Sequence, residues 1–143
     1  MDKIFIDTSI FIRFLTKDIP EKYEECENLF KIIQNGEAKS YISNFVIFEI
    51  VFVLTRQYKF PKKRVLQILD QILKIRNIIV IEQTDVTKAV KFYNKYNIKY
   101  GDCVIATQIP KGVSIVTYDA DFSKIPSLKS ITPAEIFNSD TIN

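Results

Sequence analysis

The segment Lys3-Ile4-Phe5-Ile6-Asp7-Thr8-Ser9 is the most informative in the chain. Its apolar residues are β-branched or aromatic, and such a short apolar run is typical of a strand buried on both faces. The run stops at Asp7, which is followed by two hydroxyl residues. Because open α/β sheets bind ligands beyond the carboxyl ends of their strands, Asp7 is predicted to lie at a functional site. Residues 9–15 are expected to form a helix that leaves this point.

Length and composition predict one domain over residues 1–143. Of the 143 residues, 47% are hydrophobic, which is ample for one core, and 3 Gly and 5 Pro argue against linkers. The net charge of +3 is compatible with an anionic partner without demanding one. No apolar stretch approaches the roughly 20 residues that span a bilayer, so we expect no membrane association and a cytoplasmic location.

The complete lack of histidine excludes several kinds of chemistry. Ser-His-Asp and Cys-His catalysis, His-ligated zinc and histidine general bases are all ruled out. Cys26 and Cys103 are far apart in the sequence and match no metal-binding spacing. Each is expected to be a small buried residue rather than a disulfide partner, as is typical of a reducing compartment.

Strand and helix signals alternate along the chain. Strands are predicted at 4–6, 39–43, 77–81, 113–117 and, weakly, 128–131, and helices at 9–15 and 44–54 and in the stretches beginning at Asp18, Pro61, Thr84, Gly101 and Thr132. The helix at 44–54, apolar nearly all round, and the strand at 77–81 are expected to be buried, as are Leu66 and Leu73 after Pro61. The alternation predicts an α/β protein, a three-layer α/β/α fold with a central parallel sheet of about four or five strands.

Four acidic residues follow, precede or interrupt apolar segments at the ends of predicted elements: Asp7, Glu49, Asp102 and Asp119. Glu49 is the sharpest case, because an unpaired ionised carboxylate within an apolar helix costs several kcal/mol. Two explanations stay open for it. Glu49 forms a buried ion pair with Arg13 or Arg56, or it projects into a polar crevice and holds a cation.

The other three acids each have a local structural explanation as well. Asp102 can cap or begin its helix, Asp119 and the neighbouring Asp121 can stabilise a turn, and Asp7 can cap the helix that follows it. In the predicted fold, however, the ends of the strands 4–6 and 113–117 lie on the same edge of the sheet. Carboxylates that converge there repel one another unless a divalent cation neutralises them, and hard oxygen ligands suit Mg²⁺ or Mn²⁺.

Four segments, taken together, resemble the motifs of the PIN domain family. They are Ile-Phe-Ile-Asp-Thr-Ser at 4–9, Val-Ile-Phe-Glu-Ile at 46–50, Tyr-Gly-Asp-Cys-Val-Ile-Ala at 100–106 and Ile-Val-Thr-Tyr-Asp-Ala-Asp-Phe at 115–122. The resemblance covers nearly the whole chain, and the size is similar to that of the VapC toxins of bacterial and archaeal toxin–antitoxin pairs. Cys103 stands where the family more often has Ala.

The resemblance implies a metal-dependent ribonuclease with Mg²⁺ or Mn²⁺ as its cofactor. By position, the catalytic and metal-binding residues are Asp7, Glu49, Asp102 and Asp119, with Asp121 a second acid in the last motif, so that either Asp119 or Asp121 is the fourth ligand. Thr8 and Thr117 match the supporting hydroxyl residues of the family. The resemblance also implies an antitoxin partner whose tail covers the acidic site.

An RNA substrate requires positive charge near the acids. Arg13, on the first helix, is the best single candidate for a phosphate contact. The series Lys62-Lys63-Arg64 and the lysines between 88 and 99, with nearby tyrosines for stacking, are further candidates, and solvated helix faces are the alternative explanation. The apolar stretches at 45–52 and 92–100 exceed what a small core requires, which favours a homodimer or a groove for a partner helix.

Three other functions remain as alternatives. The chain can be a housekeeping PIN-domain nuclease without an antitoxin. It can also be a phosphotransfer or phosphatase domain with Asp7 as nucleophile, although no Asp-x-Asp follows the first strand and no obvious lysine follows a later one. A non-catalytic binding module is the third alternative, but such a module has no need for all four acids.

Overall fold

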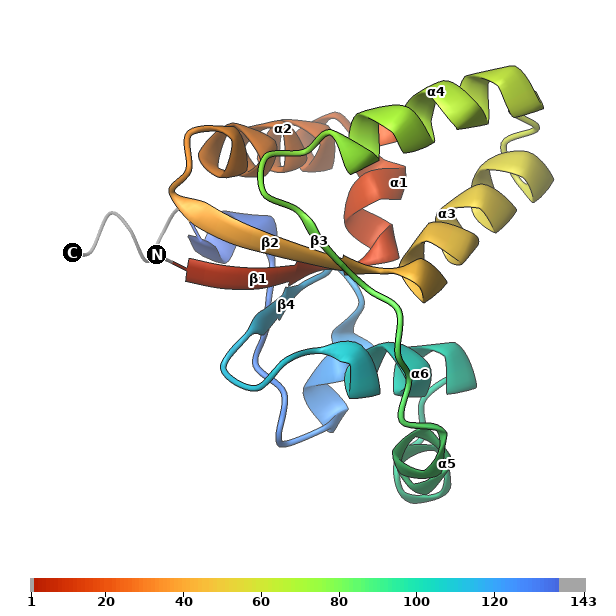
Figure 1. Cartoon of the computed structure of the whole chain (residues 1–143), viewed down its shortest axis with the longest axis vertical. Coiled ribbons are helices and arrows are strands. Elements are labelled where there is room, and N and C mark those ends of the chain that lie inside the picture. The colour runs from red at the N-terminus through yellow and green to blue at the C-terminus, as the bar shows by residue number, and fades with distance from the viewer. Residues whose placement is uncertain (1, 137–143) are drawn as a thin grey trace.

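Strands and helices alternate along the chain in the computed structural model, which describes residues 2–136 (Figure 1). The strands are β1 (Asp2–Ile6), β2 (Ala38–Ser43), β3 (Ile79–Ile81), β4 (Ser114–Val116) and β5 (Ser130–Ile131). The helices are α1 (Thr8–Thr16), α2 (Pro20–Gln34), α3 (Asn44–Arg56), α4 (Lys62–Leu73), α5 (Val86–Lys95), α6 (Tyr100–Gln108) and the 3₁₀ helix η1 (Ala120–Lys124). The helix predicted after Thr132 begins at Pro133, and its remainder lies outside the described residues.

The strands form a five-stranded, fully parallel sheet in the order β3-β2-β1-β4-β5. Helices α1 to α4 lie on one side of the sheet, and α5 and α6 lie on the other (Figure 1). The predicted three-layer α/β/α fold is therefore confirmed. The chain builds outward from β1 to β3, crosses back and continues with β4 on the opposite side of β1. The topological switch point, where such sheets bind ligands, thus lies between the carboxyl ends of β1 and β4.

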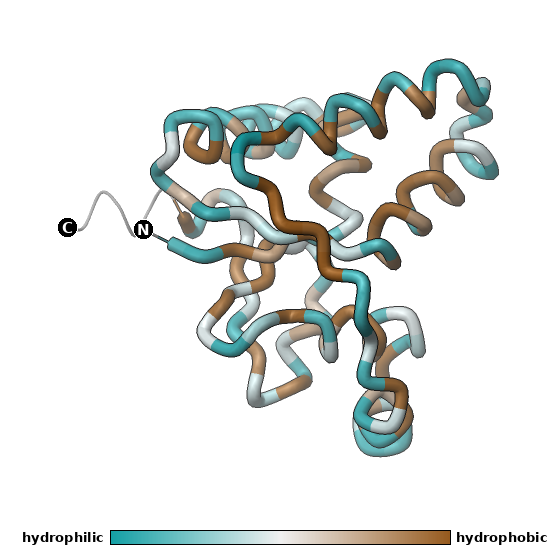
Figure 2. The backbone as a smooth tube through the Cα atoms, in the orientation of Figure 1, coloured by the Kyte–Doolittle hydropathy of each residue, from teal (hydrophilic) through white to brown (hydrophobic). Residues whose placement is uncertain are grey.

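The helices bury narrower faces than the sequence suggested. On α3, Val46, Ile50 and Leu54 are buried, but Phe48 and Phe52 are 63% and 50% exposed. Figure 2 shows that α3 is hydrophobic over most of its length, so the exposed part of the helix is apolar too. The prediction that α3 is buried all round is wrong, because a helix at the edge of a layer packs only one stripe of its surface against the sheet.

Helix α4 and strand β3 show the same effect. Leu66 and Leu73, predicted on the inner face of α4, are 53% and 56% exposed. Strand β3 was predicted to be buried, but it is an edge strand paired only with β2, and its Ile79 is 38% exposed. The helix predicted in the stretch beginning at Asp18 does not include Asp18 itself. The Asp18 carboxylate accepts hydrogen bonds from Arg13 and Thr16, and Pro20 is the first residue of the helix.

Both cysteines are free and buried, as predicted. Cys26 packs in the main core with β1, and Cys103 lies in a smaller cluster between α5, α6 and η1. Within residues 2–136, none of the helices combines the length and the apolar character that crossing a membrane requires.

Candidate active site

Asp7 lies at the switch point, directly after β1. Its backbone N–H donates to the Val116 carbonyl at 3.1 Å, which ties the end of β1 to the end of β4. The carboxylate is 4% exposed, and its Oδ2 accepts hydrogen bonds from Thr117 Oγ1 at 2.6 Å and from Ser9 Oγ at 3.0 Å. Burial raises the pKa of Asp7, and these hydrogen bonds oppose the rise.

The two hydroxyls also fix the loop that follows β4. Thr117 Oγ1 accepts a hydrogen bond from the Asp119 backbone N–H at 2.9 Å, and Ser9 Oγ accepts one from the Tyr118 N–H at 3.1 Å. One small network therefore sets the relative positions of Asp7 and Asp119. Ser9 was not predicted to be a site residue. The only signal for it in the sequence is its place as the second hydroxyl after Asp7.

Glu49 reaches the same edge of the sheet from α3. Its Oε1 accepts a hydrogen bond from Thr8 Oγ1 at 2.7 Å, which joins α3 to the first residue of α1. Burial is the largest cause of its raised pKa, and the negative charges of Asp7 and Asp119 raise the pKa further. Thr8 thus holds Glu49 much as Ser9 and Thr117 hold Asp7.

The arginines proposed as alternative partners of Glu49 do not pair with it among the described residues. Arg13 forms its ion pair with Asp18, with Nη1 and Oδ2 2.6 Å apart. Arg56 has no ion pair with Glu49 in that part of the chain. The acidic residue in α3 is therefore explained by the cluster of carboxylates and not by a closed salt bridge. The phosphate contact predicted for Arg13 stays a prediction.

Asp102 is in the first turn of α6 and is 6% exposed. Its Oδ2 is buried and has no hydrogen-bond partner among residues 2–136. Burial, followed by the charge of Asp119, raises the pKa of Asp102 to about 7. Gly101 lets α6 approach α3 closely, because a Cβ there would lie 3.3 Å from Phe45 Cζ and 3.7 Å from Glu49 Oε2. The glycine thus brings Asp102 next to the acid on α3.

Asp119 and Asp121 complete the group from the loop after β4. Asp119 caps η1, and its Oδ1 accepts a hydrogen bond from the Asp121 N–H at 2.9 Å. Asp102, Asp119 and Asp121 each place a carboxylate oxygen within 4.8 Å of the others. The structure therefore brings together all five acids predicted for the site, with Thr8 and Thr117 beside them. Their catalytic and metal-binding roles remain predictions.

The donor set fits a divalent cation. A buried carboxylate oxygen without a partner, such as Asp102 Oδ2, is costly to leave in place unless a positively charged ligand completes its contacts. The donors nearby are carboxylate oxygens, which hard cations such as Mg²⁺ and Mn²⁺ prefer. With no histidine in the chain and both cysteines elsewhere in the core, softer metals have no suitable ligands here.

A parallel sheet with a carboxylate cluster at its switch point defines an α/β domain built around an acidic, oxygen-donor site. The chain belongs to the PIN domain family, whose model matches residues 4–128. It is also similar to a VapC ribonuclease from Aquifex aeolicus (strain VF5), with 26% identity over 132 residues that cover 91% of this chain and 96% of the relative.

Solved structures support the same fold. VapBC2 from Rickettsia felis, bound to a DNA fragment from its promoter, contains a chain with a TM-score of 0.66 and 21% identity, covering 91% of this chain and 98% of its own. DNA-bound VapBC from Salmonella typhimurium gives a TM-score of 0.70 with 18% identity, covering 93% of this chain and 99% of the matched one. At these identities the likeness is one of fold.

Proposed function

We propose that this chain is a Mg²⁺- or Mn²⁺-dependent endoribonuclease and the toxin of a toxin–antitoxin pair. The observation that carries the proposal is the unpartnered, buried Asp102 Oδ2 among the carboxylates at the β1–β4 switch point. Membership of the PIN domain family and likeness to a VapC ribonuclease support it. In this proposed role, residues 1–143 form one nuclease domain that acts in the cytoplasm.

The site residues have different roles in the proposed hydrolysis of phosphodiester bonds. Asp102 and Asp119 would hold the metal, with Asp7, Glu49 and Asp121 as further ligands, directly or through water. The metal, when bound, supplies Lewis-acid stabilisation of the phosphate and acidifies water. The Thr8, Ser9 and Thr117 hydroxyls, at 2.7, 3.0 and 2.6 Å from their carboxylates, keep Glu49 and Asp7 oriented. One of the four carboxylates of Asp7, Glu49, Asp102 and Asp119 accepts the proton of the attacking water.

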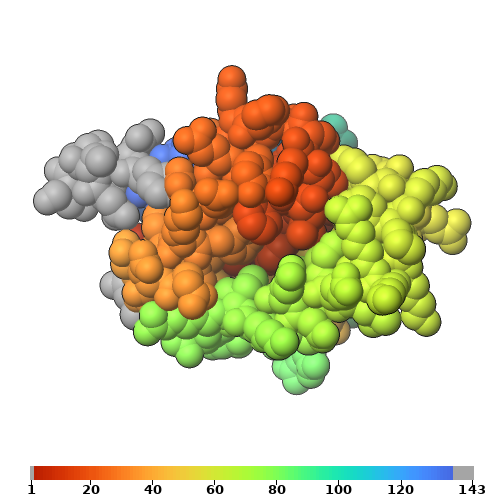
Figure 3. Space-filling model, turned by 90° about the horizontal axis from the view of Figure 1, so that it is seen from above, coloured from red at the N-terminus to blue at the C-terminus, as the bar shows by residue number. Residues whose placement is uncertain are grey.

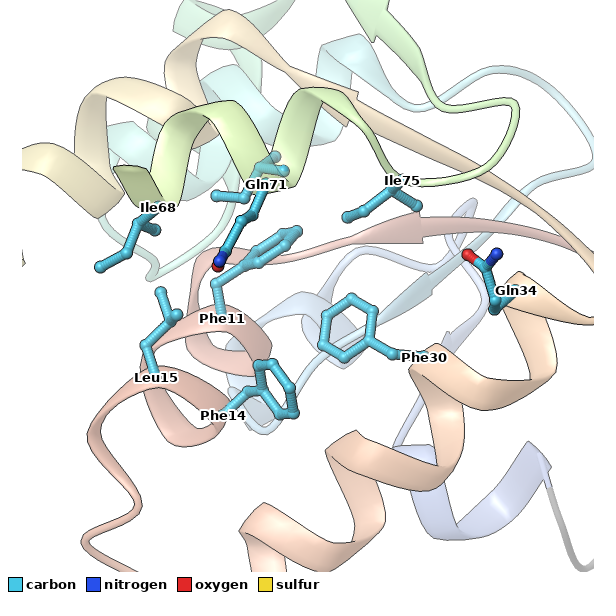
Figure 4. Close-up of a pocket in the computed structure, with 9 residues that line it drawn as sticks. Phe11, Phe14, Leu15, Phe30, Gln34, Ile68, Gln71 and Ile75 are labelled. Atoms are coloured by element: carbon cyan, nitrogen blue, oxygen red, sulfur yellow. The ribbon is translucent and has the colours of Figure 1, made fainter. Parts of the chain in front are cut away.

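An apolar groove supports the proposed antitoxin. Figure 3 shows the surface hollowed between α1 and α2 on one side and α4 on the other, and the groove has a volume of about 190 Å³. In the close-up, Phe11, Phe14 and Phe30 face Ile68 and Ile75 across it (Figure 4). We propose that an amphipathic helix of the antitoxin occupies this groove, because a row of apolar side chains flanked by polar ones matches such a helix. Gln34 and Gln71 are the polar residues of its lining.

We also propose that two copies associate through the exposed aromatic face of α3. The Phe48 and Phe52 rings are stacked, with centroids 6.4 Å apart, and both are at least half exposed. An exposed aromatic row of this kind favours self-association. Light scattering of the purified wild-type chain should give about twice the 16.7 kDa mass of one chain. The Phe48→Glu variant should give the mass of one chain. A wild-type mass of one chain would contradict the dimer.

Expression of the chain alone in a bacterial host tests the function. We expect growth arrest, relieved by co-expression of the proposed antitoxin. We also expect the purified chain to cleave single-stranded RNA with Mn²⁺ but not with EDTA. RNA cleavage without growth arrest would favour the housekeeping nuclease. Failure of the folded chain to cleave any RNA with either metal would exclude the ribonuclease.

A further inference from the structure

Lys99 occupies an unusual position next to the acids. It is the N-cap residue of α6, three residues before Asp102, and its side chain makes no capping hydrogen bond. Ser, Thr, Asp or Asn is preferred at such a position, because their oxygens satisfy free N–H groups of the first turn. A lysine cannot do this. The residue therefore has no local structural function that explains its side chain.

The ammonium group of Lys99 lies over the acidic cluster. Its Nζ is 3.9 Å from Asp119 Oδ2, although the side chain is 75% exposed. The positive charge also lowers the pKa of Glu49 and of Asp102, so it acts on acids from both α3 and α6. An ion pair this long and this exposed contributes little to stability. The feature that matters is the position of the positive charge of Lys99, next to the acidic cluster.

Lys124, the other lysine that pairs with an acid of this cluster, behaves differently. Its Nζ lies 2.9 Å from Asp121 Oδ1 and also donates to the Asn97 carbonyl at 3.2 Å. Two short contacts hold Lys124 in place. Lys99 has one long contact among the described residues, so its flexible stem can move the charge away from Asp119 at little cost.

We propose that Lys99 is the phosphate-binding residue of the active site. Without metal, its ammonium group serves as a counter-ion for Asp119. When a divalent cation neutralises the acids, that attraction is lost and Lys99 turns outward to bind a phosphate of the RNA next to the scissile bond. The inference rests on the proposed ribonuclease function and adds to it the residue that positions the substrate backbone.

Kinetics of RNA cleavage by Lys99→Met test the substrate contact. We expect kcat/KM to fall about tenfold, mostly through a higher KM, because one charge-assisted contact is lost. The slope of log kcat/KM against log salt concentration should flatten by about 0.7, the value for one phosphate contact to a single strand. Lys99→Arg should restore both. A KM and a salt slope unchanged by Lys99→Met would overturn the proposal.

Lys74→Met is the matched control, since it removes the same charge from an exposed lysine at the C-terminal end of α4. We expect its KM to stay within about twofold of the wild-type value, because a charge away from the acids contributes only to the general field. An equal loss in Lys74→Met would show that the effect comes from general surface charge and would overturn a specific role of Lys99.

Manganese binding, measured by calorimetry without RNA, separates this inference from the proposed function. Lys99→Met should bind Mn²⁺ about two- to fivefold more tightly, because the positive charge 3.9 Å from Asp119 Oδ2 no longer opposes binding of the metal. Unchanged Mn²⁺ affinity would overturn the counter-ion role whether or not the chain cleaves RNA. Absence of RNA cleavage by the wild type would instead overturn the ribonuclease.

Discussion

Replacing Asp7 by Asn is expected to lower the rate of RNA cleavage by about 10²-fold or more, with the protein still folded. The asparagine keeps the volume of the side chain, and its carbonyl oxygen can still accept the hydrogen bonds of Ser9 and Thr117. It removes one negative charge from the group that is proposed to bind the metal. Loss of an outer partner of a metal ligand already costs about 10- to 100-fold, so loss of a ligand's charge should cost at least as much.

The measurement is the initial rate of cleavage of a labelled RNA in saturating Mn²⁺, with a thermal melt of each variant to confirm folding. Asp70→Asn on the exposed side of α4 is the matched control, because it removes an equal charge far from the switch point. Its rate should stay within about twofold of the wild-type rate. Wild-type activity in Asp7→Asn would show that Asp7 takes no part in cleavage. Detection of a phosphorylated Asp7 in the wild type would favour the phosphotransfer alternative.

Asp102→Asn is expected to raise the melting temperature of the metal-free protein and to abolish stabilisation by Mn²⁺. The pKa of Asp102 is raised from its usual value to about 7, so the folded state binds a proton more readily than the unfolded state. The Asp102 carboxylate therefore lowers the free energy of unfolding increasingly as the pH rises from about 4 towards 7. Above about pH 7 the full loss of stability persists. The neutral asparagine carries no such cost.

The two effects are separated by melts with and without the metal. At neutral pH we expect Asp102→Asn to melt about 3 °C higher than the wild type without metal, for a relief of about 1 kcal/mol. Mn²⁺ at about 100 times its Kd should stabilise the wild type by about 2.7 kcal/mol, and the variant hardly at all. A variant that melts lower and still gains stability from Mn²⁺ would show that Asp102 is structural.

The network around Asp7 explains how the fold tolerates so many acids in one place. Each of the two hydroxyl groups, on Ser9 and Thr117, donates a hydrogen bond to the carboxylate and accepts one from the backbone of the loop that carries Asp119. The carboxylates are thereby held in position before any ligand arrives. Such preorganisation reduces the reorganisation that binding and catalysis would otherwise require.

The sequence by itself determined the architecture and the membership of the acidic cluster. The apolar run 4–6 predicted the central strand, and the alternation of strands and helices predicted parallel pairing. Glu49 stood out because an acid within an apolar helix needs a reason. These inferences succeeded because apolar periodicity is local, and because parallel strands bring their carboxyl ends to one edge whatever the details of packing.

Only the tertiary structure decided which groups touch. The Thr117–Asp7 hydrogen bond joins residues 110 positions apart, and no local pattern predicts it. Lys99 and Lys124 form ion pairs with acids of the cluster, whereas Arg13, the cation predicted for a phosphate contact, is paired with Asp18. The local sequence pattern also could not predict which side chains are buried, as the exposed Phe48 of α3 shows. Each of these outcomes depends on which face of an element meets a neighbour from elsewhere in the chain, and that is settled by the crossovers and the packing of the whole domain.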